Sequence, residues 1–253
     1  MPVNKIPFGI PGLDEALNGG IPENNLVLIS GGAGTGKSTL CLQYLVNGAK
    51  KGEKGLYIST EQNLADLSKQ GEQYGWNLQE LVDKNLLRVV YIDIIREDFV
   101  FKKIKDSIQD FKPNRLVIDS LNTLSDFTAS TDFARQLYMQ RGTMSPTISD
   151  KVLPENLTEN LLKRKIMMAF LSEIKNTKTT ALLTSELPEK GDYLSADGVS
   201  EFLSDGVIIL NYLGVGLTQF RSIQIRKMRY SNHEKDYIGY DLKAGIEIQK
   251  DVV

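Results

Sequence analysis

A nine-residue run, GGAGTGKST at 31–39, constrains this chain more than any other feature. It fits the pattern G-x-x-x-x-G-K-[ST], with a β-branched run, LVLIS, before it and a helical pattern after it. Glycines let the backbone curl so that its N–H groups converge on an anion, and the helix that follows adds the positive end of its dipole. The run also fits a glycine-rich turn that only caps a helix, but its context favours a phosphate-binding loop. The residues expected to line this phosphate loop are Gly31, Gly32, Ala33, Gly34, Thr35, Gly36, Lys37, Ser38 and Thr39.

A phosphate loop of this kind predicts ATP and Mg²⁺ as ligands. Lys37 is expected to bridge the β- and γ-phosphates, and Ser38 is expected to ligate Mg²⁺. Such a site also needs a carboxylate at the end of an apolar strand that binds Mg²⁺ directly or through a bound water, and Asp119, which closes RLVID, is the clear candidate. The same aspartate also fits the N-cap of a following helix, and the two roles are compatible.

Glu61 is the candidate for the group that polarises the attacking water. It follows the predicted strand KGLYIST, and a carboxylate at the carboxyl end of a neighbouring strand can act as a general base. A charged residue at a strand end also fits a simple solvated position. Thr184, Ser185 and Glu186 end another strand at the same edge, where they fit either a sensor of the γ-phosphate or plain strand termination.

The alternation of short apolar runs with helical patterns predicts an α/β fold with a mostly parallel, twisted sheet covered by helices on both faces. After residue 205 no helical pattern intervenes between the strand-like runs, so antiparallel hairpins are expected at a sheet edge. Strands are predicted at 26–30, 54–60, 86–92, 115–119, 180–185, 205–213, 220–229 and 237–249, and helices from the phosphate loop to 49 and at 64–74, 78–83, 100–111 and 159–175.

The 253 residues are expected to form one domain, because neither a low-complexity tract nor a Pro/Ser-rich linker divides them. Within it, residues 126–158 have little periodicity and are expected to be a long loop or an insertion. Residues 205–253 are expected to form the C-terminal hairpin region. The first twelve residues lack the apolar core of a signal peptide, and no apolar run is long enough for a membrane helix, so a cytoplasmic protein without a membrane partner is expected.

The charge and the cysteine content of the chain exclude some classes of function. The chain carries 30 basic and 32 acidic side chains, which gives a net charge of −2 and no general basic field for nucleic acid or anionic membranes. Its single cysteine, Cys41, excludes an internal disulfide framework and any zinc site built from several thiolates.

Several motifs in the same order resemble the KaiC-like branch of the RecA superfamily of ATPases. The opening IPFGIPGLDEALNGGIPENNLVLISGGAGTGKST resembles the N-terminal signature of that family, and STEQ at 59–62 occupies the place of its catalytic acidic pair. RLVIDSLNTL resembles its Walker B strand, LLTSE its sensor strand, and DGVIIL with IQIRKMRYSNH its C-terminal pattern. The resemblance covers nearly the whole chain as a single domain of this type.

The resemblance implies a RecA-type core that assembles into a homo-oligomeric ring, often of six subunits, with ATP held between neighbours. It also implies that Lys227 and Arg229, here called the basic pair, reach the nucleotide of the adjacent subunit. Strand alternation independently places both residues on one face, where two cations would neutralise charge on a transferred phosphoryl group. Without the resemblance, the pair also fits a solvated basic edge strand.

Two residues depart from the family pattern. Glu61 is followed by Gln62 where two adjacent glutamates are common, so a single carboxylate must serve as the base and turnover is expected to be slow. Tyr230 occupies a position where glycine is usual after K-M-R, which affects the path of the loop that carries the basic pair.

The loops that carry DNA in RecA recombinases offer a test for a nucleic-acid partner. Residues 126–158 contain three basic and four acidic side chains, and residues 186–201 contain one basic and five acidic. Neither segment is an electrostatic funnel for phosphates, so single-stranded DNA is not the favoured partner. Phe127, Phe133 and Tyr138 fit base stacking or, more commonly, local packing.

The leading hypothesis is therefore a Mg²⁺-dependent ATPase that converts ATP to ADP and phosphate, with Glu61, Lys37, Lys227 and Arg229 as its catalytic residues and Ser38 and Asp119 as its metal ligands. A second hypothesis is a nucleotide-gated assembly or signalling scaffold with negligible hydrolysis. A third is an accessory ATPase of recombinational DNA repair. A small-molecule kinase is less favoured, because the sequence shows no signature of an acceptor pocket.

Overall fold

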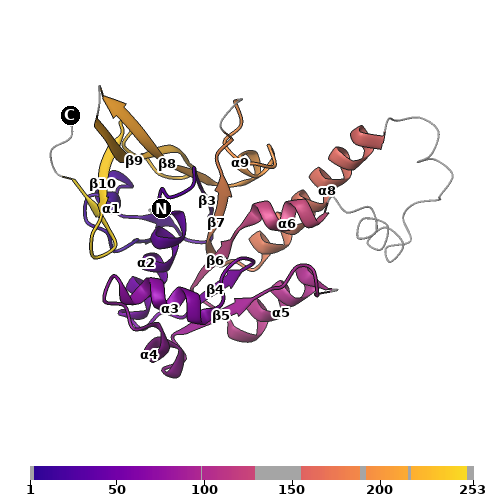
Figure 1. Ribbon diagram of the computed structural model, residues 1–253, viewed down its shortest axis with the longest axis horizontal. Helices are drawn as coiled ribbons and strands as arrows, with labels where there is room; N and C mark the ends of the chain where they lie inside the picture. Colours follow the sequence, from indigo (N-terminus) through magenta and orange to yellow (C-terminus); the bar gives the residue numbers. More distant parts are fainter. Residues whose placement is uncertain (1–2, 98, 129–154, 189–191, 216–217, 250–253) are drawn as a thin grey trace.

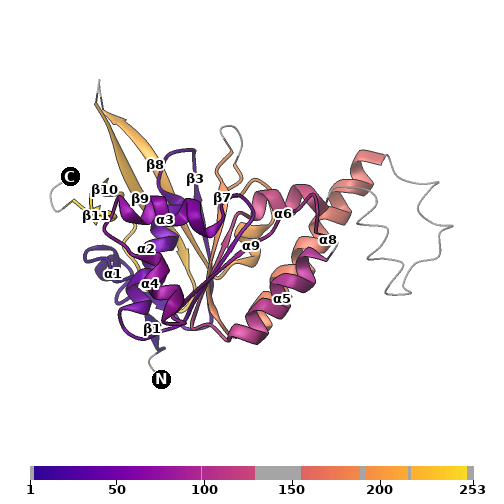
Figure 2. The same ribbon diagram turned by 60° about the horizontal axis from the view of Figure 1, so that its bottom comes forward.

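The computed structural model describes residues 3–97, 99–128, 155–188, 192–215 and 218–249. Its centre is a nine-stranded sheet in the order β11-β10-β9-β8-β3-β7-β6-β4-β5, with helices on both faces (Figures 1 and 2). This architecture confirms the predicted α/β class. No helix within the described ranges is long and apolar enough to cross a membrane.

The parallel part of the sheet forms because its strands are apolar on both faces. Every residue of β3, β4 and β6 is buried. Alternate residues of β3 pack into different cores: Val27 and Ile29 lie in one, and Leu26 and Leu28 in the other. The parallel strands are β3 (Leu26–Gly31), β4 (Gly55–Ser59), β5 (Leu87–Tyr91), β6 (Arg115–Asp119), β7 (Thr180–Glu186) and β8 (Gly206–Val215).

The helices divide between these two cores, as Figure 2 shows. The first core receives α2 (Lys37–Ala49), α3 (Leu64–Glu72) and α4 (Leu78–Asp83). The second receives α5 (Val100–Phe111), α6 (Leu121–Thr128) and α8 (Glu155–Asn176). Helices therefore cover both faces of the parallel part of the sheet.

The N-terminal segment forms a separate two-stranded sheet from β1 (Lys5–Ile6) and β2 (Ile21–Pro22), with the short helix α1 (Leu13–Ala16) between them. Asp14 organises the turn before α1, since its carboxylate accepts hydrogen bonds from the amides of Phe8, Gly9 and Ile10. Burial raises the pKa of Asp14, and these backbone donors oppose that shift. The run GIPGLD at 9–14 is thus a turn, and Asn47 of α2 holds it by donating to the carbonyl oxygens of Phe8 and Gly9.

The C-terminal edge confirms the predicted hairpins and corrects one of them. β8 runs parallel to β3 and pairs with the antiparallel strand β9 (Thr218–Met228). The run at 237–249, predicted as one strand, is two: β10 (Ile238–Leu242) and β11 (Ile246–Ile248). They pair antiparallel around a turn in which Gly245 adopts φ 115°, a conformation that favours glycine.

The predicted boundaries of the long loop at 126–158 are wrong at both ends. Residues 126–128 belong to α6, and α8 begins at Glu155, four residues before the predicted helix. The remainder, 129–154, lies outside the described residues and includes Phe133, Arg135, Tyr138, Arg141 and Lys151. The short helix α9 (Ser200–Leu203), between β7 and β8, was not predicted.

Candidate nucleotide site

The phosphate loop connects the carboxyl end of β3 to the first turn of α2. Gly34 and Gly36 adopt φ of 72° and 92°, which side chains rarely tolerate. A Cβ atom on Gly31 would lie 2.6 Å from the carbonyl oxygen of Leu210, so glycine is also required there for close packing. The sequence therefore builds a tightly curled loop ahead of a helix N-terminus, which is suited to an anion.

Lys37 begins α2 and folds back over the loop. Its ammonium donates to the carbonyl oxygens of Gly31 at 2.8 Å and Gly32 at 3.0 Å. Desolvation lowers the pKa of Lys37, and three nearby carboxylates, those of Glu186, Asp119 and Glu61, oppose the shift. The structure thus brings one cation and three carboxylates from four separate elements to one edge of the sheet.

Asp119 ends β6 beside the carboxyl ends of β4 and β7. It is only 7% exposed, and each carboxylate oxygen accepts a hydrogen bond of 2.5 Å: Oδ2 from the Tyr57 hydroxyl, and Oδ1 from that of Thr184. Burial and the Asp119 carboxylate raise the pKa of Tyr57, whereas a hydrogen bond with Ser38 opposes this. Tyr57 thus joins the two residues predicted to bind Mg²⁺, and these hydrogen bonds, rather than the capping of α6, orient Asp119.

Glu61 lies just past β4 and is exposed at the same edge. The hydroxyl of Ser120 donates to its Oε1 at 2.9 Å, and the amides of Glu61 and Gln62 donate to the hydroxyl of Ser59 at 3.2 and 2.9 Å. This turn holds the carboxylate close enough to influence the pKa of Lys37. Ser120 was not predicted as a site residue; its position directly after the Asp119 strand was the available signal.

The end of β7 is tied to α6 by Asn122, another residue that the sequence did not single out. Its Oδ1 accepts from the hydroxyl of Ser185 at 3.0 Å and from the amide of Glu186 at 3.1 Å. The hydroxyl of Ser185 in turn accepts from the amide of Ala196 at 3.0 Å. Strand β7 is therefore connected to the segment that leads into α9.

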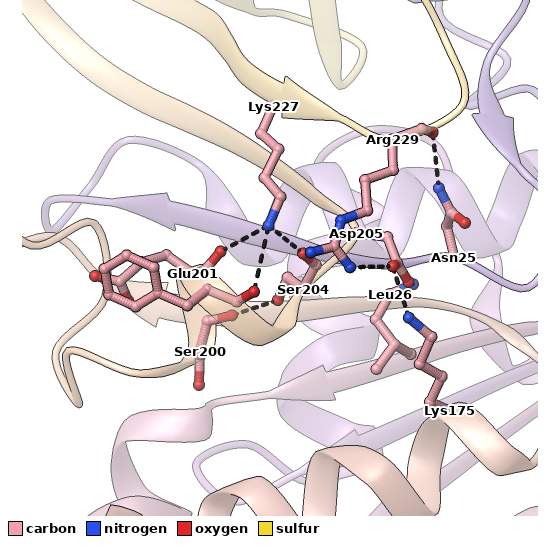
Figure 3. A network of polar contacts seen from close by, with 10 residues as sticks. Asn25, Leu26, Lys175, Ser200, Glu201, Ser204, Asp205, Lys227 and Arg229 are labelled. Atoms are coloured by element: carbon pink, nitrogen blue, oxygen red, sulfur yellow. Dashed lines mark hydrogen bonds and ion pairs between the residues drawn. The ribbon is translucent and has the colours of Figure 1, made fainter.

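The basic pair lies away from this cluster, and Figure 3 shows its partners. Lys227 donates to three carbonyl oxygens at the end of α9: Ser204 at 2.5 Å, Glu201 at 3.1 Å and Phe202 at 3.5 Å. Arg229, just beyond β9, pairs with Asp205 Oδ1 at 3.1 Å. Desolvation and then the charge of Arg229 lower the pKa of Lys227. The two side chains therefore lie side by side, as predicted.

Strand register separates the basic pair from the phosphate loop of its own chain. Lys227 pairs with Val207, which lies beside Leu28 of β3, whereas the loop follows Gly31 at the carboxyl end of that strand. The three residues of strand from Leu28 to Gly31, at about 3.3 Å each, correspond to roughly 10 Å. The side chains of the pair contact Ser204 and Asp205, so the pair lies toward the amino ends of β3 and β8, away from the loop at the carboxyl end of β3.

Two acidic residues of the 186–201 segment serve local structure. Asp197 accepts from the amides of Val199 and Ser200 at the start of α9, at 3.0 and 2.9 Å. Glu201 is buried and accepts from the amide of Leu194 and the hydroxyl of Ser195. These two acidic side chains thus stabilise the local fold of the segment and do not form a ligand-binding surface.

A family model describes this architecture: the model for the KaiC ATPase matches residues 6–145 and 146–253, which is nearly the whole chain. The chain belongs to the KaiC family of ATPases. Its KaiC-type domain is 27% identical over 258 residues to a circadian clock oscillator protein KaiC from Thermostichus vulcanus, covering 97% of this chain and 44% of that protein. The chain thus spans less than half the length of that relative.

Two archaeal relatives match this KaiC-family chain over most of their own length. A UPF0273 protein from Aeropyrum pernix is 29% identical over 248 residues, covering 91% of this chain and 87% of that protein. The crystal structure of a KaiC-like protein from Pyrococcus horikoshii has a TM-score of 0.78 and 27% identity, covering 98% of this chain and all of that one. These matches confirm a RecA-like core with a single KaiC-type domain.

Proposed function

We propose that this chain forms one ATPase domain over residues 1–253 that hydrolyses ATP, with Mg²⁺, at the interfaces of a homo-oligomeric ring, with six subunits as the expected number. The observation that carries this proposal is the convergence of Lys37, Asp119 and Glu61 at the edge of the sheet that bears the phosphate loop. A cation, a metal-binding carboxylate and a candidate base are the groups that phosphoryl transfer to water needs.

The residues present fit a nucleotide and a metal ion. The glycine loop offers a close approach to phosphates, and Lys37 supplies positive charge. Asp119 retains free acceptor capacity, because a carboxylate has about four lone-pair positions and two are used. Ser38 and Asp119 would hold Mg²⁺, which supplies shielding of the phosphate charge. Glu61 would accept the proton of the attacking water.

The basic pair would act on the nucleotide of a neighbour. Its position supports this, because the pair lies toward the amino ends of β3 and β8, and Lys227 is about 10 Å along the strand from its own phosphate loop. Arg229 would have to exchange Asp205 for phosphate oxygens. Lys175, which also pairs with Asp205 Oδ1 at 2.7 Å, would keep that buried carboxylate partnered after the exchange.

The decisive experiment compares nucleotide binding with phosphate release in Glu61→Gln. We expect the variant to bind ATP as the unmodified chain does and to lose most turnover, by about 10²–10⁴-fold, which is the usual contribution of a general base. Glu72→Gln, an exposed glutamate on α3, is the matched control and should retain full turnover. Unchanged turnover in Glu61→Gln would remove the assigned base, and no ATP binding by the unmodified chain would overturn the whole proposal.

Gln62 favours one alternative, a nucleotide-gated scaffold. Glu61 has no second glutamate beside it, and its carboxylate already accepts from Ser120. Sizing the protein with ATP, with ADP and without nucleotide, alongside a phosphate-release assay, separates the two functions. ATP-dependent assembly without phosphate release would support the scaffold.

A further inference from the structure

Two tyrosine hydroxyls from the C-terminal strands hold the backbone of the phosphate loop. Tyr212 on β8 donates to the carbonyl oxygen of Gly34 at 2.8 Å, and Tyr240 on β10 donates to the carbonyl oxygen of Thr35. Tyr212 is 44% exposed, whereas Tyr240 is almost fully buried. Neither residue was predicted from the sequence to have a role in the site.

These tyrosines belong to one row across three strands. Arg221 on β9 pairs with Tyr212 on one side and with Tyr240 on the other, and directly opposed residues in antiparallel strands share a face. The guanidinium of Arg221 lies over the Tyr212 ring, 5.3 Å from its centroid. The row therefore faces the phosphate loop as a unit fixed by the sheet.

The hydrogen bonds determine where two loop amides point. In a planar trans peptide, the carbonyl of one residue and the N–H of the next point in opposite directions. Fixing the carbonyls of Gly34 and Thr35 toward the tyrosines thus directs the N–H groups of Thr35 and Gly36 away from them. Across the described ranges, neither amide donates to another group of the protein. Two successive free amides of this kind form an anion-binding concavity.

Packing alone does not explain the two hydroxyls. The side chain of Leu242 on β10 lies close to Gly36, since a Cβ atom on Gly36 would be 3.3 Å from it. This apolar side chain already packs β10 against the loop without either hydroxyl. Burial raises the pKa of Tyr240. A buried tyrosine hydroxyl needs a hydrogen-bond partner, whereas a phenylalanine at the same place would need none. The hydroxyl of Tyr212 is not forced into its contact by burial, yet it reaches the adjacent carbonyl.

We propose that Tyr212 and Tyr240 are positioning residues that orient the amides of Thr35 and Gly36 toward the phosphate chain of the nucleotide. This inference rests on the proposed function, since it requires that the loop bind a nucleotide. Neither tyrosine need contact the nucleotide; both act through the peptide groups of the loop. The C-terminal strands thus set the affinity of the loop for phosphates.

The test uses Tyr212→Phe, Tyr240→Phe and the double variant, with Tyr237→Phe, an exposed tyrosine just before β10, as the control. The dissociation constants of ADP and of inorganic pyrophosphate are measured by competition against a fluorescent nucleotide. Loss of one neutral hydrogen bond should weaken both ligands by about two- to tenfold, and the double variant should lose more. The KM for ATP should rise with kcat nearly unchanged, which a general loss of structure would not produce.

The result for each ligand decides the inference. Unchanged binding of both ligands by Tyr212→Phe and by Tyr240→Phe would overturn it. A loss of ADP affinity with unchanged pyrophosphate affinity would also overturn it, because the hydroxyls would then affect binding of the nucleoside and not of the phosphates. If Tyr240→Phe lowers the melting temperature, the half-exposed Tyr212→Phe decides alone. Failure of the unmodified chain to bind either ligand would overturn the proposed function itself.

Discussion

The hydroxyl of Tyr57, on β4, donates a 2.5 Å hydrogen bond to Oδ2 of Asp119 at the end of the adjacent strand β6. Thr184 on β7 holds the other oxygen, so the two strands that flank β6 both contribute a donor. A buried carboxylate with two such donors keeps its orientation before any metal ion arrives. Tyr57 therefore connects the packing of the sheet to the proposed metal site.

Tyr57→Phe should raise the Mg²⁺ concentration needed for half-maximal ATP turnover by about 10- to 100-fold. The ring still fills its place in the core, but Asp119 loses one donor and its fixed direction, and residues that orient metal ligands commonly contribute about one to two orders of magnitude. The measurement is a Mg²⁺ titration at saturating ATP. Tyr91→Phe, at the exposed end of β5, is the control. An identical Mg²⁺ dependence in Tyr57→Phe and the unmodified chain would contradict the role.

Mixing two inactive variants should restore activity. Under the proposed function, Lys37→Ala removes the cation that binds the phosphates and leaves the basic pair intact, whereas Arg229→Ala does the reverse. In randomly mixed rings, about a quarter of the interfaces combine an intact loop with an intact basic pair. Phosphate release by an equal mixture should therefore exceed that of either variant alone. Activity that never rises above the two separate values would show that Arg229 does not act across an interface.

Asp205→Asn should lower the free energy of unfolding by about 1–3 kcal/mol. Asp205 is 1% exposed, pairs with Lys175 and Arg229, and accepts from the amide of Leu26 at 3.2 Å. Both cations are half-exposed and would be hydrated by water, which keeps the loss below that of a fully buried pair. Denaturant unfolding measures the change against Asp236→Asn, an exposed aspartate. Arg229→Ala should lower stability less than Asp205→Asn, because Lys175 remains; an equal loss would contradict this account.

Tyr230→Gly should raise the free energy of unfolding by about 0.5–1 kcal/mol. Tyr230 adopts φ 66°, where a side chain costs about 1–2 kcal/mol, and the residue is 72% exposed, so little buried area is lost. The greater freedom of glycine in the unfolded chain offsets part of this gain. Thermal and denaturant unfolding are the measurements, with Tyr237→Gly as a control that should be destabilised. A loss of stability in Tyr230→Gly would show that the ring makes a compensating contact.

The sequence predicted the elements whose signal is local. Short apolar strands, the glycine loop and the carboxylates at strand ends were all placed correctly, because parallel strands bring their carboxyl ends to one edge. Tyr57, Asn122 and Tyr212 were missed, since their partners lie 62, 63 and 178 positions away along the chain. A tyrosine inside a fully buried strand was the one usable signal for Tyr57, because its hydroxyl requires a partner.

The interior partners of the basic pair were also beyond sequence reasoning. Alternation along a strand predicted that Lys227 and Arg229 share a face, and their side chains do lie together. Their contacts with Asp205 and with the end of α9 form because β8 lies beside β3 in the sheet. No local sequence pattern predicts that strand order. The left-handed conformation of Tyr230 explains in physical terms why glycine suits that position.

The phosphate loop and the basic pair lie toward opposite ends of neighbouring strands, so under the proposed function each subunit of the ring has a direction. Contacts between such subunits are head-to-tail, so the surface that donates differs from the surface that receives. An open row of subunits would always end in one loop that lacks a donor, whereas closure supplies a donor to every loop. Under the proposed function, every catalytic centre is therefore complete only when the ring has closed.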